Sequence, residues 1–142
     1  MTSANNKYII FKVKELYCAV NCLDVQEIIR ETDKVTTIPG SENYIDGVLN
    51  LRGSIVTIIN LALYFKLDCV PEENESIIIL NDDDERIGVK VTQIIDVVNG
   101  TNVKLENTPA IPHNLNPLFV ESVMQIDNEI VTVLDVTEIL SE

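Results

Sequence analysis

Tryptophan is absent from this chain, and several other residue types are scarce. Only 5% of its 142 residues are aromatic, glycine and proline number five each, and there is one histidine. The three cysteines, Cys18, Cys22 and Cys69, form neither an even disulfide set nor a Cys-x-x-Cys metal pattern, so we interpret them as small apolar residues. The lone His113 has no serine, cysteine or second histidine paired with it. We therefore expect no catalytic residues, no metal site and no cofactor.

Positive charge is also in short supply. Ten Lys and Arg residues oppose 23 Asp and Glu residues, which gives a formal net charge of −13. Nucleic acids and anionic membranes are bound through clustered Lys and Arg, so neither is an expected partner, and protein partners are favoured. No apolar run has the length that spans a bilayer, and residues 1–6 lack the parts of a signal peptide. We expect a cytoplasmic protein.

What is present is a series of short β-rich segments in one domain-sized chain, residues 1–142, without a linker. They predict a hairpin from 7–13 and 16–20, a short strand over 35–39, and a second hairpin from 77–80 and 86–91. Residues 61–65 predict a short segment that caps the sheet, and residues 135–140 predict a short amphipathic end. Residues 23–29 differ, because apolar residues at 25, 28 and 29 after a possible N-cap at Asn21 predict two turns of amphipathic helix.

Two polar segments separate these elements. The acidic turn 81–85 lacks the spacing and the later glutamate of a calcium loop, so we interpret it as a solvated hairpin tip. Residues 109–117 form a proline-rich crossover.

The chain is organised around the stretch Gly47–Leu61. Two β-rich runs flank the corner Arg52-Gly53-Ser54, where glycine permits the positive φ of a tight strand reversal, so a hairpin is predicted. Arg52 is the only cation between Lys34 and Lys66. Its five donors need acceptors, so it either clamps backbone carbonyls or contacts another protein.

The same stretch recurs 75 positions later. Residues 123–136 match it in residue type at nearly every position, and Asp127-Asn128-Glu129 replaces the corner. Asparagine keeps the turn chemistry, but the cation is lost. Residues 91–95 further parallel 25–29, and the second hairpin echoes the first. One fold unit is therefore present twice, and a function for Arg52 is favoured because the repeat forms without it.

This duplication predicts two small β-barrels. The side chains expected at their centres are Ile10, Val20, Val48, Leu51, Ile58, Val89, Val123 and Val133.

Along nearly its whole length the chain resembles the CheW family of chemotaxis coupling proteins. The resemblance rests on Val25-Gln26-Glu27-Ile28, on Ile38-Pro39, on Gly47-Val48-Leu49-Asn50-Leu51-Arg52-Gly53, on the following Ile-Val-x-Ile-Ile-x-Leu, on Gly88-Val89 and on the terminal Ile-Val-x-Val-Leu-Asp. It implies an all-β fold with short helices, built as two interlocked five-stranded SH3-like barrels in a single CheW-like domain.

The resemblance also implies a non-enzymatic adaptor that couples the cytoplasmic tips of chemoreceptors to the CheW-like regulatory domain of the histidine kinase CheA. Such an adaptor is recruited to membrane-associated receptor arrays. The matching receptor-groove positions are Val25, Glu27, Gly47, Arg52, Gly53 and Val97. The chain departs from the family at Thr57, Asn60 and Ala62, where Pro, Asp and Arg are usual, which puts the detail of the contacts in question.

Two alternatives remain open on the residues alone. One is a small barrel that binds a ligand or serves as an enzyme accessory domain, which would need a pocket lined by convergent polar groups. The other is a structural β domain without a partner.

Overall fold

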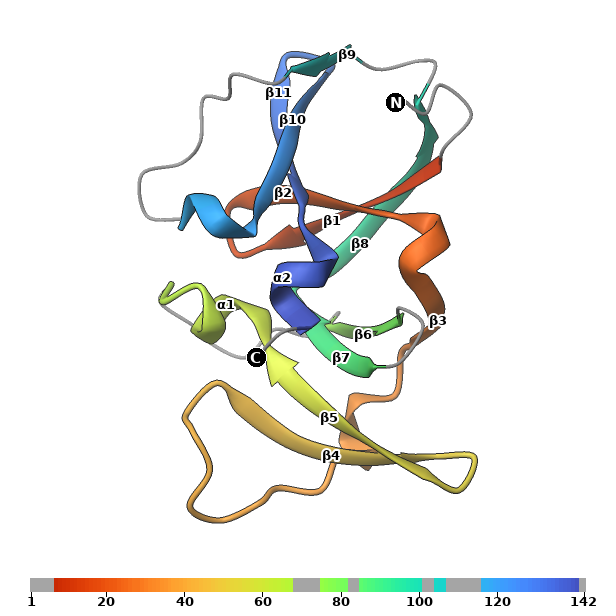
Figure 1. Cartoon of the computed structure of the whole chain (residues 1–142), viewed down its shortest axis with the longest axis vertical. Coiled ribbons are helices and arrows are strands. Elements are labelled where there is room, and N and C mark those ends of the chain that lie inside the picture. Colours follow the sequence, from red (N-terminus) through yellow and green to blue (C-terminus); the bar gives the residue numbers. More distant parts are fainter. Residues whose placement is uncertain (1–6, 68–74, 82–84, 101–103, 107–115, 141–142) are drawn as a thin grey trace.

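The computed structural model describes residues 7–67, 75–81, 85–100, 104–106 and 116–140. Its strands form two curved sheets, one in the upper and one in the lower half of Figure 1. Sheet A has the order β8-β1-β2-β11-β10-β9, and sheet B has the order β3-β6-β7-β5-β4. The elements are β1 (Lys7–Val13), β2 (Leu16–Asn21), η1 (Cys22–Asp24), β3 (Val25–Ile29), η2 (Thr32–Lys34), β4 (Ile45–Leu51), β5 (Ser54–Asn60), α1 (Leu61–Tyr64), β6 (Ser76–Asn81), β7 (Arg86–Val91), β8 (Gln93–Asn99), β9 (Lys104–Glu106), η4 (Pro117–Phe119), β10 (Val120–Ile126), β11 (Glu129–Leu134) and α2 (Val136–Leu140).

The two sheets share one plan, so the predicted duplication is confirmed in three dimensions. Strands β8, β1, β2, β11 and β10 of sheet A take the places of β3, β6, β7, β5 and β4 in sheet B. Each sheet has one parallel pair, β2 with β11 and β5 with β7, among antiparallel ones. In sheet A the three-residue strand β9 pairs with β10. At the equivalent place in sheet B, the single residue Thr36 pairs with Val48 of β4. The all-β fold with short helices is therefore as predicted.

The repeated hairpins agree down to their corners and bulges. Arg52 and Gly53 have φ of 51° and 87°, and Asp127 and Asn128 have φ of 49° and 69°. Both corners thus need residues that tolerate positive φ, which Gly, Asn and Asp do at low cost. Each first strand also carries one extra residue near its start, Asp46 in β4 and Glu121 in β10.

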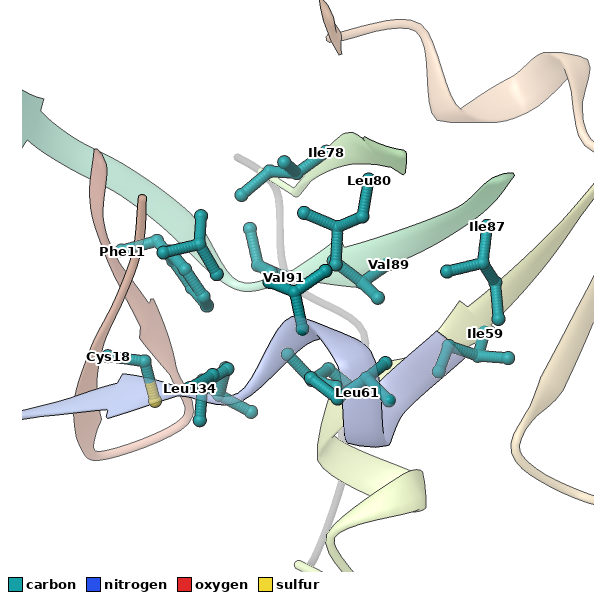
Figure 2. Packing of buried hydrophobic residues seen from close by; sticks show 14 of the residues in the cluster. Phe11, Cys18, Ile59, Leu61, Ile78, Leu80, Ile87, Val89, Val91 and Leu134 are labelled. Atoms are coloured by element: carbon teal, nitrogen blue, oxygen red, sulfur yellow. The ribbon is translucent and has the colours of Figure 1, made fainter. Parts of the chain in front are cut away.

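Three apolar clusters hold the sheets together. Each sheet encloses a small core of its own, around Met124 and Val133 in sheet A and around Ile58 and Ile79 in sheet B. A third and larger cluster lies between the sheets and includes Phe11. Figure 2 shows side chains from strands of both sheets and Leu61 of α1 in this cluster. The helix α2 adds Val136, Ile139 and Leu140. The two barrels are therefore interlocked and share one interface core.

The helix predicted over 23–29 is wrong. Asn21 does act as a cap, accepting a hydrogen bond from the Leu23 N–H at 2.9 Å, but it caps only the 3₁₀ turn η1. The strand β3 follows and pairs with β6, with a register shift between Val25 and Glu27. The extra residue of this bulge breaks the strict alternation of a strand, so the apolar spacing imitated a helix. In sheet A the residue equivalent to Val25 is Ile94. The predicted parallel of 91–95 with 25–29 matched Val25 with Val91 instead, so that alignment was wrong by three positions.

Other predicted elements were mostly confirmed. The hairpins predicted from 7–20 and 77–91 are β1–β2 and β6–β7. The capping segment predicted over 61–65 contains α1, and the amphipathic end predicted over 135–140 contains α2. The strand predicted over 35–39 is reduced to the Thr36 bridge, because Pro39 lacks a donor and Gly40 takes a positive φ.

Six of the eight predicted core residues are buried, namely Ile10, Val20, Ile58, Val89, Val123 and Val133. Val48 and Leu51 are only half-buried. In β4 the side chain of Leu49 enters the core, so Val48 lies on the opposite face.

Cys18 is buried and Cys22 is half-buried, which agrees with their interpretation as small apolar residues. Burial raises the pKa of the Cys18 thiol to about 12, so this thiol stays protonated at neutral pH. Four predicted features lie at least partly outside the described residues. These are Cys69, His113, most of the crossover 109–117, and the acidic tip at 82–84.

Candidate functional site

The β4–β5 corner is a tight two-residue turn fixed by its own side chains. Arg52 and Gly53 occupy its centre with positive φ. Asn50 braces it, because its Oδ1 accepts a hydrogen bond from the Gly53 N–H at 3.0 Å. The Arg52 side chain, which is 72% exposed, therefore projects from a rigid base.

Arg52 binds the carboxylate of Glu27 on β3. Its Nη1 lies 2.5 Å from Oε2, and its Nη2 lies 3.2 Å from Oε1, a two-point contact. The hydrogen bond from Arg52 holds the pKa of Glu27 below its ordinary value, and the same contact raises the pKa of Arg52. Two roles were left open for Arg52, contact with backbone carbonyls or contact with another protein, and neither included the acceptor that the structure shows, a side chain 25 positions earlier.

This ion pair joins parts of sheet B that the strand order keeps apart. β3 and β4 lie at opposite ends of the order β3-β6-β7-β5-β4. The chain segment after β3 meets β4 at the Thr36–Val48 bridge, where the N–H of each residue donates to the carbonyl of the other at 2.8 Å. β3 itself meets the β4–β5 corner through Glu27 and Arg52. The two contacts close the sheet into a barrel and give its closing seam a defined geometry.

Gly47 lies on this seam, at the other end of β4 from the corner. Its φ is 148°, and an added Cβ would lie 2.1 Å from the Thr36 carbonyl oxygen. Any larger residue would both strain the backbone and push the 35–36 segment away. Gly47 is therefore required where β4 passes close to that segment.

The six predicted groove residues do not form one contact cluster. Glu27, Arg52 and Gly53 lie together at the corner. Val25, two residues before Glu27, is half-buried against the core between the sheets. Val97 lies in sheet A on β8, opposite Ile9, and is 51% exposed.

Two features of the site were not predicted from the sequence. The first is the partnership of Glu27 with Arg52, although both had been singled out. The second is an ion pair between Lys90 on β7 and Asp46 in the β4 bulge, with Nζ and Oδ2 2.9 Å apart. Its signal in the sequence is a lone lysine inside the apolar run 86–91.

The three departures from the usual family pattern lie in β5 and α1. Asn60 is buried and caps α1 by accepting a hydrogen bond from the Leu63 N–H at 3.2 Å. Ala62 is buried in α1, and Thr57 is half-buried on β5.

A separate cavity of about 740 Å³ lies where α1 approaches η4. Tyr44, Tyr64, Phe65 and Phe119 line it, and their ring centroids are 5.0 to 6.1 Å apart. These rings pack mainly against one another. The polar groups around them, from Glu42, Asn43, Lys66 and Asn116, give no catalytic arrangement.

Within the described parts of the chain, no helix is both long and apolar enough to cross a membrane.

Comparison with known proteins identifies the family. The model of the CheW-like domain matches residues 7–142. The chain is 26% identical over 135 residues to the chemotaxis protein CheW of Thermotoga maritima, covering 93% of this chain and 85% of that protein. It is 29% identical over 140 residues to CheW of Klebsiella aerogenes, covering 98% and 84%.

Two further matches concern the fold and a kinase. The crystal structure of the scaffolding protein TtCheW from Thermoanaerobacter tengcongensis superposes with a TM-score of 0.81 at 22% identity, covering 94% of this chain and 86% of that one. The sensor histidine kinase CheAY of Helicobacter pylori matches 78% of this chain at 29% identity, over 14% of its own length. The chain therefore belongs to the CheW-like domain family and is a non-catalytic chemotaxis scaffold that couples receptors to the kinase CheA.

Proposed function

We propose that this chain binds the cytoplasmic tip of a chemoreceptor on the surface formed by Val25, Glu27, Gly47, Arg52, Gly53 and Val97, named here the receptor surface. The observation that carries the proposal is the Arg52–Glu27 ion pair. It is exposed, it closes the seam of sheet B, and the repeated hairpin folds without it.

The ion pair prepares this surface for binding. By holding the corner to β3, Arg52 fixes the relative position of the two segments that a receptor helix would contact. Because Arg52 compensates the charge of Glu27, covering Glu27 with an apolar helix costs less free energy than burying an unpaired carboxylate. A rigid surface binds with less loss of conformational entropy than a flexible one.

The kinase binds elsewhere on the chain in this proposal. The CheAY match indicates that a histidine kinase of this pathway contains a domain with the same fold. We propose that the regulatory domain of CheA contacts the chain through this CheW-like part. The assembly then forms on the cytoplasmic side of membrane-associated receptor arrays.

The test is receptor pull-down together with receptor-dependent kinase activation by purified variants. Arg52→Ala should weaken receptor binding by roughly tenfold or more, because a charge-assisted contact at the surface is lost, while binding to CheA stays normal. Asp127→Ala, at the equivalent corner of sheet A, is the matched control and should change neither. Circular dichroism verifies that each variant is folded.

A charge exchange separates two roles of Arg52. Arg52→Glu combined with Glu27→Arg rebuilds the ion pair with reversed direction, so receptor binding should recover if Arg52 acts by holding the corner. Binding that stays weak would mean that Arg52 contacts the receptor directly. Normal kinase activation by folded Arg52→Ala would overturn the assignment of the receptor surface.

A further inference from the structure

The start of β4 depends on how its bulge is held. Ile45 pairs with Ile59 and Gly47 pairs with Ile58, which leaves Asp46 as the extra residue. A bulge bends its strand and increases the local twist. The contacts of Asp46 therefore influence where the next residue, Gly47, lies.

Lys90 holds this bulge from β7. Its Nζ lies 2.9 Å from Oδ2 of Asp46 and 3.8 Å from Oε1 of Glu75. The side chains of Lys90, Asp46 and Glu75 are 14%, 27% and 15% exposed, so solvent screens them less than an open surface pair. Lys90 pairs with Asn60 on one edge of β5, and β4 pairs with the other edge. The ion pair thus crosses β5 and links its two neighbours.

Sheet A forms the same bulge without this lysine. Glu121 is the extra residue of β10, and Asn21 of β2 stands where Lys90 stands in β7. The pKa of Glu121 is raised by burial and then by the carboxylates of Asp135 and Asp24. Because the bulge persists among carboxylates, the fold itself does not require a cation at this place.

We infer that Lys90 is a positioning residue for the receptor surface, which fixes the start of β4 so that Gly47 stays against Thr36. β4 is then held at both ends, by Lys90 and Asp46 at its start and by Arg52 at its corner. Between them lie the two 2.8 Å hydrogen bonds of the Thr36–Val48 bridge. The inference rests on the proposed function, because Gly47 belongs to the receptor surface only through that proposal.

The test removes the charge and keeps the bulk of the side chain. Lys90→Met should weaken binding of a receptor-tip fragment roughly five- to tenfold. Binding to CheA should stay within about twofold of normal. Amide hydrogen exchange at Thr36 and Val48 should become faster, because their bridge opens more often. Lys12→Met makes the same replacement on β1 of sheet A, away from β4, so it is the control and should change none of these quantities.

Two further variants keep the test decisive. Asp46→Asn breaks the same ion pair without altering β7, so it should reproduce the effect if Lys90→Met folds poorly. Lys90→Asp combined with Asp46→Lys should restore both binding and exchange protection. Unchanged exchange at Thr36 and Val48 in a folded variant would overturn the inference.

The outcome also separates the inference from the proposed function. Normal receptor binding by Lys90→Met, with weak binding by Arg52→Ala, would overturn the role of Lys90 and leave the receptor surface in place. Normal binding by both variants would show that the receptor surface itself is wrong, and the role of Lys90 falls with it.

Discussion

Sheets A and B have the same strand order, the same parallel pair, the same corner geometry and the same bulge, yet their charges differ. Where sheet B has Arg52 and Lys90, sheet A has Asp127 and Asn21. Glu27 of β3 corresponds to Asp96 of β8, because each is the first residue after the bulge of its strand.

This difference separates what the fold needs from what it tolerates. The backbone plan survives with ion pairs in one copy and carboxylates in the other, so apolar burial and turn chemistry determine the architecture. The ion pairs of sheet B are additions to that architecture. Because the ion pairs of Arg52 and Lys90 both lie in sheet B, that sheet is the better candidate for a binding surface.

The largest expected effect tests whether the two cores contribute alike. Ile58 and Val133 occupy equivalent buried positions, and Ile58 is the larger side chain. Ile58→Ala should lower the free energy of unfolding by about 3 to 4 kcal/mol, and Val133→Ala by about 2 to 3 kcal/mol, through lost burial and the cavity left behind. Urea titration measures both. A greater loss for Val133→Ala would mean that sheet A carries more of the stability.

A smaller effect concerns a packing difference between the central strands. Gly88 of β7 stands where Ala19 stands in β2, and a Cβ on it would lie 2.4 Å from Cδ1 of Ile58. Gly88→Ala should therefore destabilise the protein by about 1 to 3 kcal/mol through overpacking. Thermal unfolding gives the measurement, and Ile58→Val, which removes that methyl group, is expected to recover part of the loss. Without such a recovery, the crowding explanation fails.

A gain in stability is expected at the bulge of sheet A. Burial and neighbouring carboxylates raise the pKa of Glu121 above its unfolded value, so its charge opposes folding at neutral pH and this cost disappears as pH falls through the folded pKa. Glu121→Gln should stabilise the protein at pH 7 by up to about 0.5 kcal/mol, because the side chain is only partly covered and solvent screens much of its charge. Asp46→Asn, at the equivalent bulge, should destabilise instead. Equal effects of the two variants on unfolding would remove the charge distinction between the sheets.

The smallest stability effect belongs to the exposed ion pair. The pKa of Glu27 is lowered in the folded state, so the pair contributes stability above the unfolded pKa of a glutamate and loses it as pH falls through the folded value. Arg52→Ala should therefore lower the melting temperature slightly at pH 7 and not at all in strong acid. Differential scanning calorimetry over this pH range checks it, with Asp127→Ala as the control. A large drop at pH 7 would make Arg52 a structural clamp.

The parts of the fold that depend on neighbouring residues were predictable from the sequence. The hairpins, their corners and the 75-residue repeat follow from alternation and turn chemistry within short windows. β3 was mistaken for a helix because the bulge at Gln26 interrupts the alternation on which that prediction relied.

The contacts of the site could not be predicted in the same way. Arg52 meets Glu27, and Lys90 meets Asp46, across strands that are distant in the sequence. Spacing along the chain does not encode which strand edges close on each other. Closure of sheet B, whose order has β3 and β4 at opposite ends, brings Arg52 to Glu27. The pairing of β5 with both β4 and β7 brings Lys90 to Asp46.

The strand order also bears on how the chain reaches its folded state. All strands of sheet B lie within residues 25–91, whereas sheet A combines strands from before and after that segment, and its parallel pair joins β2 to β11. During synthesis from the N-terminus, sheet B can therefore form while β8 to β11 are still to be made. The pairing of β2 with β11 closes the longest loop, so we expect it to form last and the β2 edge of the β1–β2 hairpin to stay open until then.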